Sequence, residues 1–175
     1  LLDAGDTYFS IIASLDVTQP NAASDVLKVG DSYVIKYKIG GGSGVNQVDL
    51  HYSANSSTAT PTWTSIVLDH TPSPGGCGDP TECQYTWSPI PDAISNDVKI
   101  RVQDSSTPIP DPTNVYDLSD FAFNIKGKLT VTHPNATAPD DLLRAGGSYS
   151  IRWVANGDIK NKQCGTPPCN LDIYL

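Results

Sequence analysis

Residues 117–136 read DLSDFAFNIKGKLTVTHPNA, and residues 3–22 read DAGDTYFSIIASLDVTQPNA. At a constant offset of 114 residues, ten of these twenty positions are identical. The identical residues of the second copy are Asp117, Asp120, Phe123, Ile125, Leu129, Val131, Thr132, Pro134, Asn135 and Ala136. A repeat at this spacing is typical of a chain in which similar modules follow one another in series.

The repeat divides the 175 residues into three parts. Residues 14–126 are expected to form one complete module, which at about 110 residues is long enough to bury a core. Residues 1–13 are expected to be the last strand of a preceding module, and residues 127–175 the first strands of a following one. A second similarity supports this division, because residues 143–153 match residues 27–37 at an offset of 116.

Composition and the spacing of apolar residues predict an all-β chain. The sequence has 14 Gly, 14 Pro and no Met, and no stretch keeps the helical spacing of apolar residues. Apolar and polar residues alternate over residues 31–39, 48–53 and 98–103, which is the pattern of half-buried strands. About seven such short strands in one module are typical of an Ig-like sandwich. We therefore expect tandem Ig-like, fibronectin-III-like antiparallel β-sandwiches.

The charge of the chain disfavours two classes of partner. The formal net charge is -8 at pH 7, and the sequence pI is about 4.5. Because nucleic acid is bound through clustered Lys and Arg, nucleic acid is not expected as a partner. No run of about 18 apolar residues is present, so membrane insertion is not expected either.

The four cysteines form two local pairs. Cys77 and Cys83 bracket GDPTE, and Cys164 and Cys169 bracket GTPP. Glycine and proline turn the chain back within each pair, so we expect two disulfides, each of which closes a small loop. Free thiols and a shared Zn²⁺ are the alternatives, although these spacings are longer than those of zinc knuckles. Disulfides indicate an extracellular or periplasmic location.

Four motifs occur in order along the complete module. They are VGDSYVIKY at 29–37, VDLHYS at 48–53, VKIRVQDSS at 98–106 and DLSDFAFNI at 117–125. This order resembles the Ig-like module of the Ser-Thr-rich, cell-wall-associated family, which occurs in fungal GPI-anchored and glucan-assembly proteins. The same kind of module recurs in tandem in large secreted surface proteins of bacteria and archaea. The resemblance implies an Ig-like fold at the cell surface and no catalytic residues.

Four aspartates lie around the expected loop that joins the last two strands of the module. They are Asp104, Asp111, Asp117 and Asp120. Because Ca²⁺ prefers several carboxylate and carbonyl oxygens from such a loop, these residues are candidate calcium ligands. The alternative is ordinary turn chemistry, since Asp before Ser or Pro is common in turns. Calcium is the one candidate cofactor, and no other is expected.

Aromatic residues, histidines and asparagines give the remaining candidates. Trp87 and Trp153 follow the core pattern, whereas Trp63 is a candidate for stacking on a sugar if it is exposed beside another aromatic residue. The three histidines are far apart in the sequence and no catalytic motif accompanies them, so we expect no catalytic residues and no enzyme. Asn55 and Asn135 begin the N-glycosylation sequons NSS and NAT.

Two functions fit these observations. In the first, the protein is a non-catalytic extracellular structural protein whose modules, joined by the short linker 126–128, build a cell-surface layer, stalk or filament. Its partners are then neighbouring repeats or other copies, held by strand exchange if residues 7–12 complete the sandwich of another copy. In the second, it is a carbohydrate- or protein-binding module of a larger secreted enzyme or adhesin, with cell-wall polysaccharide as one candidate ligand.

Overall fold

The computed structural model describes residues 13–41, 45–73, 77, 81–105, 115–134 and 145–159. The strands are β1 (Ser14–Gln19), β2 (Val26–Lys28), β3 (Tyr33–Gly40), β4 (Val48–Ser53), β5 (Thr64–His70), β6 (Cys83–Trp87), β7 (Ser95–Asp104), β8 (Tyr116–Leu118), β9 (Phe123–Lys126), β10 (Lys128–His133) and β11 (Arg152–Asn156). The predicted all-β class is confirmed. Within the described ranges, no helix is long and apolar enough to cross a membrane.

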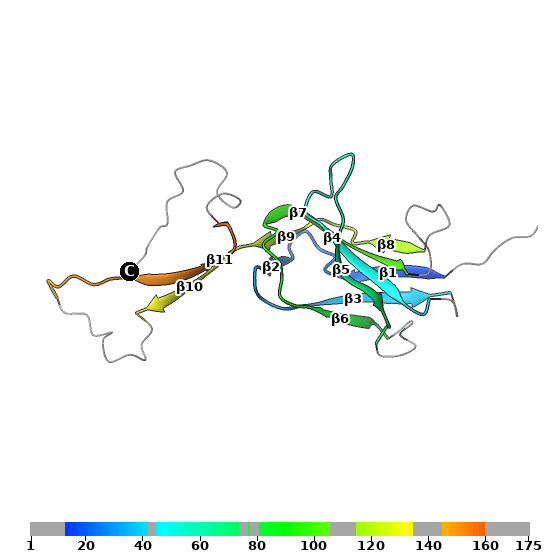
Figure 1. Cartoon of the computed structure of the whole chain (residues 1–175), viewed down its shortest axis with the longest axis horizontal. Coiled ribbons are helices and arrows are strands. Elements are labelled where there is room, and N and C mark those ends of the chain that lie inside the picture. Colours follow the sequence, from blue (N-terminus) through cyan, green and yellow to red (C-terminus); the bar gives the residue numbers. More distant parts are fainter. Residues whose placement is uncertain are drawn as a thin grey trace, which may run out of the picture.

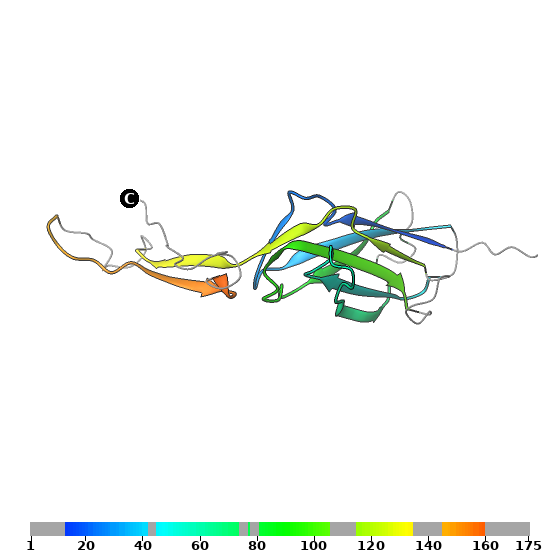
Figure 2. The ribbon, with the colours of Figure 1, turned by 90° about the horizontal axis from the view of Figure 1, so that it is seen from above.

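Two sheets face each other in the part of the chain from β1 to β9. One has the strand order β1-β3-β6, and the other has the order β2-β9-β7-β4-β5 with β8 also paired to β7. Figures 1 and 2 show these two layers from perpendicular directions. The neighbours pair antiparallel, except that β2 pairs with β9 in parallel. The chain therefore forms an Ig-like β-sandwich. The short strand β2 departs from the expected antiparallel order, since it runs parallel to β9, the last strand of this sandwich.

The core lies between the two sheets. Strand β7 alternates, so Ile100 and Val102 are fully buried, and Ile35 and Tyr37 of β3 are fully buried on the facing sheet. Burial of each such side chain stabilises the fold by roughly 1.5–3 kcal/mol. The sequence of residues 63–68 does not assign an inward face to β5, because Trp63 and Val67 compete with Ile66 and Leu68 for the core. Its pairing with β4 contains two register shifts, and Leu68 is exposed.

Strands β10 and β11 form a separate two-stranded hairpin at the end of the sandwich (Figure 1). Strand β9 ends at Lys126 and β10 begins at Lys128, so Gly127 alone separates them. In Figure 2 the hairpin extends away from the sandwich along the long axis of the molecule. The last strand of the sandwich therefore continues almost directly into the first strand of the hairpin.

The hairpin has the same register as the pairing of β1 with β3. Val17 lies opposite Tyr37, and Val131 lies opposite Trp153, which are the same positions at the sequence offsets of 114 and 116. A register shift follows at once in both pairs of strands. Their surroundings differ, since Val17 and Tyr37 are 1% and 0% exposed whereas Val131 and Trp153 are 57% and 45% exposed. The hairpin thus repeats the geometry of β1 and β3 with its apolar face uncovered.

The carboxylate of Asp97 anchors the loop between β4 and β5. It accepts hydrogen bonds from Ser56 Oγ at 2.5 Å, Ser57 N at 2.9 Å and Ser57 Oγ at 2.7 Å. Burial by itself raises the pKa of Asp97, but the hydrogen bonds from Ser56 and Ser57 outweigh it and leave the pKa below its ordinary value. The ionised carboxylate therefore stabilises the folded protein.

We expect Asp97→Ala to lower the free energy of unfolding by roughly 1 kcal/mol at neutral pH, the range for hydrogen bonds to a partly exposed charge. Because the folded pKa is depressed, this contribution is present above the unfolded pKa and is lost as the pH falls through the folded pKa. Urea unfolding of both proteins at several pH values between about 7 and 3 measures it. A difference that stays constant with pH would contradict the assignment.

Candidate functional site: the joint after the sandwich

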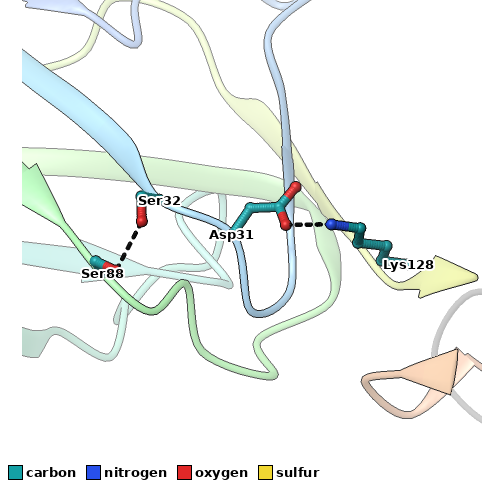
Figure 3. Close-up of polar contacts among 4 residues, drawn as sticks. All are labelled: Asp31, Ser32, Ser88 and Lys128. Carbon is teal, nitrogen blue, oxygen red and sulfur yellow. Dashed lines mark hydrogen bonds and ion pairs between the residues drawn. The ribbon is translucent and has the colours of Figure 1, made fainter. Parts of the chain in front are cut away.

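Two loops at one end of the sandwich form the surface that meets the hairpin. The backbone N–H of Gly30 donates to the carbonyl of Ile90 at 2.9 Å, and the N–H of Ile90 donates to the carbonyl of Asp31 at 2.8 Å. Next to these loops, the hydroxyls of Ser32 and Ser88 share a hydrogen bond of 2.7 Å (Figure 3). These bonds join the loop after β2 to the loop after β6, so the two loops present one surface.

Two polar contacts connect this surface with the hairpin. Lys128 Nζ, at the start of β10, lies 2.6 Å from Asp31 Oδ1 (Figure 3). At the same end of the hairpin, just after β11, the N–H of Asp158 donates to Asp92 Oδ2 at 2.9 Å. The side chains of the ion pair remain 38% and 40% exposed, so it contributes about 0–1 kcal/mol and is weakened by salt. The contacts fix an orientation more than they supply stability.

Close packing at the turn after β11 completes the joint. Gly157 has φ +88°, a conformation that favours glycine, and a Cβ placed on it would lie 3.0 Å from Val29 Cγ2 and 3.1 Å from Ile94 Cδ1. The side chain of Ile159 packs against Gly127 in the linker. The turn that follows β11, residues 157–159, therefore packs against both loops of the sandwich and against the linker. Such an arrangement restricts rotation about the joint.

Asp117 and Asp120, two of the predicted calcium ligands, tie the end of the sandwich to its beginning. Asp117 Oδ2 accepts the N–H of Val17 at 2.7 Å, and Asp120 Oδ2 accepts the side-chain N–H of Asn21 at 2.8 Å. The N–H of Asp120 donates in return to Asn21 Oδ1 at 2.5 Å. We call these four residues the closing clamp. All four belong to the ten positions that are identical in the two stretches of the repeat.

The other two predicted calcium ligands lie elsewhere or outside the described residues. Asp104 is buried at the end of β7, where its N–H donates to the carbonyl of Val115 at 2.9 Å. Asp111 lies outside the described residues. Among the residues that the structure describes, no three Asp, Glu, His or Cys side chains group as metal ligands. Calcium binding stays a prediction, and a melting temperature unchanged by a chelator would contradict it.

The predicted disulfide between Cys77 and Cys83 is present, with the two Cα atoms 5.1 Å apart. Both cysteines are buried beside the core. Such a disulfide in an Ig-like domain is typical of an extracellular or secretory-pathway protein. The second predicted pair, Cys164 and Cys169, lies outside the described ranges.

We expect the loss of the Cys77–Cys83 disulfide to lower the free energy of unfolding by about 2 kcal/mol, because the closed loop is short. Denaturant unfolding of the double variant Cys77→Ala and Cys83→Ala measures this loss. The unsubstituted protein under reducing conditions is the matched control, since it loses the bond and keeps both side chains. A loss confined to the double variant would assign the effect to packing of the two sulfur atoms instead.

The candidate tryptophans and Asn55 make packing contacts or hydrogen bonds within the sandwich. Trp63 is half-buried, and the guanidinium carbon of Arg101 lies 4.5 Å from its ring centroid, so a cation covers one face of the ring. The ring of Trp87 is buried, 5.1 Å from the ring centroid of Tyr52. Asn55 Oδ1 accepts hydrogen bonds from Ser53 Oγ and Thr62 N, both at 2.9 Å. Sugar stacking and glycosylation at Asn55 stay predictions, as does glycosylation at Asn135, which lies outside the described ranges.

The sequence did not point to the residues that make the joint. Asp31 and Lys128 are separated by 97 residues, and Asp92 and Asp158 by 66. The sequences of the two copies nevertheless differ at the turn that contacts the sandwich. The turn after the strand expected at 31–39 is GGGSG at 40–44 in the first copy, whereas the second copy has NGDI at 156–159.

Comparison with protein-family models gives no match, and comparison with curated proteins gives none either. Among solved structures, the chain is similar to the crystal structure of the RIG-5 IG1 homodimer, with 11% sequence identity and a TM-score of 0.35. The match covers 65% of this chain and 98% of that chain. The likeness is distant, and the Ig-like assignment rests on the two facing sheets. The resemblance to the Ser-Thr-rich, cell-wall-associated family stays a prediction from the motifs.

Proposed function

We propose that this protein is a non-catalytic extracellular structural protein in which Ig-like sandwiches follow one another in series and form a cell-surface layer, stalk or filament. The observation that carries the proposal is the shared register of the two strand pairs. Strands β10 and β11 repeat the pairing of β1 and β3, including the position of the register shift. A copy that pairs in the same way is best explained as the start of a second sandwich.

The exposed face of the hairpin supports the same proposal. In the first module the side chains at these positions pack against the facing sheet. In the hairpin the corresponding positions, Leu129, Val131 and Trp153, are exposed. A two-stranded hairpin is only marginally stable in water, so an apolar face of this kind calls for a covering layer. In the proposal this layer is the rest of the second sandwich, supplied by further strands of the same chain.

A structural role also fits the joint. Gly127 alone separates the strands on its two sides, and the hairpin turn packs against the sandwich. Short linkers with packed contacts restrict interdomain motion, which is what a stalk or surface layer requires. The disulfide agrees with an extracellular location.

Stretching the intact natural protein between its two ends tests the proposal. Each module should unfold in a separate step that releases about 114 residues, or roughly 380–410 Å of extended chain before subtraction of the folded length. The mass of the intact chain should be several times 18.7 kDa. A mass near 18.7 kDa with one unfolding step would contradict serial modules. It would favour instead an assembly of separate copies held by strand exchange.

A further inference from the structure

We propose that the turn at 157–159 docks the module that begins with β10 on the sandwich before it, and that this docking holds the joint at 126–128 in one orientation. This inference rests on the proposed serial function and adds to it which residues hold one module on the module before it. Three features support it: the turn at 157–159, the sequence that follows β3 in the first module, and the surface of the sandwich that the turn contacts.

The turn of the second copy makes the side-chain and backbone contacts of the joint. Asp158 donates its N–H to the carboxylate of Asp92, and Ile159 packs on Gly127. Gly157, Asp158 and Ile159 are all half-buried, although the neighbouring strand β11 is exposed along its whole length. The turn is therefore the part of the hairpin that is held by the sandwich.

In the first module, Gly41 has the same backbone conformation as Gly157, but the sequence that follows it lacks the docking side chains. The strand register places Gly40 at the position of Asn156, so Gly41 corresponds to Gly157. Their φ angles are +82° and +88°. The next two positions, which hold Asp158 and Ile159 in the second copy, are Gly and Ser in the first. A turn of this composition offers no apolar side chain for docking and loses more conformational entropy on ordering.

The first strand of the first module also lacks a residue that contributes to the joint in the second copy. Ser14 occupies the position of Lys128, so the first module has no cation at this place to pair with a preceding module. On the receiving side, Gly146 has φ +79°, close to the φ of +84° at Gly30. The residue after Gly146 is Gly147, whereas the residue after Gly30 is Asp31. The two residues of the ion pair in Figure 3 are therefore not repeated at the equivalent positions, Ser14 and Gly147.

The experiment gives the second hairpin the residues of the first module and measures its motion relative to the sandwich. The variant of the 175-residue chain carries Lys128→Ser, Asn156→Gly, Asp158→Gly and Ile159→Ser. Nitrogen-15 relaxation and residual dipolar couplings report whether the sandwich and hairpin tumble as one body. The matched control is Val154→Lys, which introduces the Lys38 of the first module on β11 but leaves the turn unchanged.

The unsubstituted chain and the control should show one rotational correlation time and one alignment tensor for the sandwich and hairpin. The four-residue variant should lose the common tensor, and its hairpin should tumble faster than its sandwich. If its hairpin loses the β10–β11 amide protection, a variant with Asp31→Ala, Asp92→Ala and Ile159→Ser replaces it. This variant leaves β10 and β11 unchanged, removes both polar contacts and the packing of Ile159, and should decouple the two parts in the same way.

Two results would overturn the inference: a hairpin that already moves independently in the unsubstituted chain, or variants that stay coupled to the sandwich. Neither result contradicts the proposed serial arrangement of modules. That arrangement is tested by the mass and the number of unfolding steps of the intact protein, which depend on how many modules there are. They do not depend on how stiffly the modules are joined. The two proposals therefore fail separately.

Discussion

Tyr37→Ala is expected to lower the free energy of unfolding of the sandwich by about 3–5 kcal/mol, whereas Trp153→Ala at the equivalent position is expected to cost less than about 1 kcal/mol in the 175-residue chain. The reason is burial: Tyr37 is fully enclosed between the sheets and Trp153 is exposed. Denaturant unfolding, followed by circular dichroism, measures both values. The pair compares one position of the repeat in two environments.

The same pair of substitutions also tests the proposed second module. In the intact natural protein, the facing sheet of that module should cover Trp153, so Trp153→Ala should then cost about 3–5 kcal/mol in the unfolding of that module. A cost that stays below about 1 kcal/mol in the intact protein would contradict the proposed second sandwich. Quenching of Trp153 fluorescence by iodide should decrease in parallel, from the 175-residue chain to the intact one.

Tyr37→Phe is the matched control for Tyr37→Ala. The Tyr37 hydroxyl is buried and has no hydrogen-bond partner among the described residues, and burial strongly raises its pKa. Replacing the buried hydroxyl by hydrogen should therefore be neutral or stabilising. A raised folded pKa also means that the hydroxyl resists ionisation, so the unsubstituted protein should lose stability as the pH rises above the pKa of an unfolded tyrosine. Tyr37→Phe should lose less.

Asp117→Ala is expected to lower the free energy of unfolding by about 2–3 kcal/mol. Asp117 accepts the N–H of Val17, which lies on a strand with little exposure on its inward side. Without the carboxylate, this partly buried N–H loses its charged acceptor, and the first strand loses its bond to the end of the module. Denaturant unfolding measures the loss, and hydrogen exchange at Val17 locates it.

The matched control for Asp117→Ala is Asp16→Ala on the neighbouring strand. Asp16 is exposed, so its removal changes the net charge by the same amount and should alter the free energy of unfolding by no more than about 0.5 kcal/mol. Equal losses for the two variants would show that charge, and not the closing clamp, is responsible. Unchanged exchange at Val17 in Asp117→Ala would contradict the clamp directly.

The strands were predictable wherever their residues alternate. The pattern at 98–103 corresponds to β7, in which Ile100 and Val102 point into the core. The pattern failed for β5, because two register shifts break the alternation that a sequence can display. The parallel pairing of β2 was also missed. A strand of three residues carries too little pattern to reveal its neighbour.

The candidate site was much less predictable than the strands. Four aspartates that are near one another in sequence were taken together as calcium ligands, yet Asp117 and Asp120 bind the beginning of the module, 100 and 99 residues away. The carboxylates of Asp117 and Asp120 accept hydrogen bonds from the first strand and the turn after it, and calcium binding by the four aspartates stays a prediction. Sequence proximity gave no information about which backbone groups would come within hydrogen-bond distance.

The sequence by itself determined the all-β class, the alternating core positions and the repeat, because each of these is written in local spacing or in direct comparison of two stretches. Only the tertiary structure decided which repeated residues form the closing clamp and which turn rests on the sandwich. The polar contacts among them join residues 66 to 100 positions apart, and their partners are brought together by the stacking of two sheets and by the one-residue linker. Contacts of this kind depend on the path of the chain in space, which local patterns do not encode.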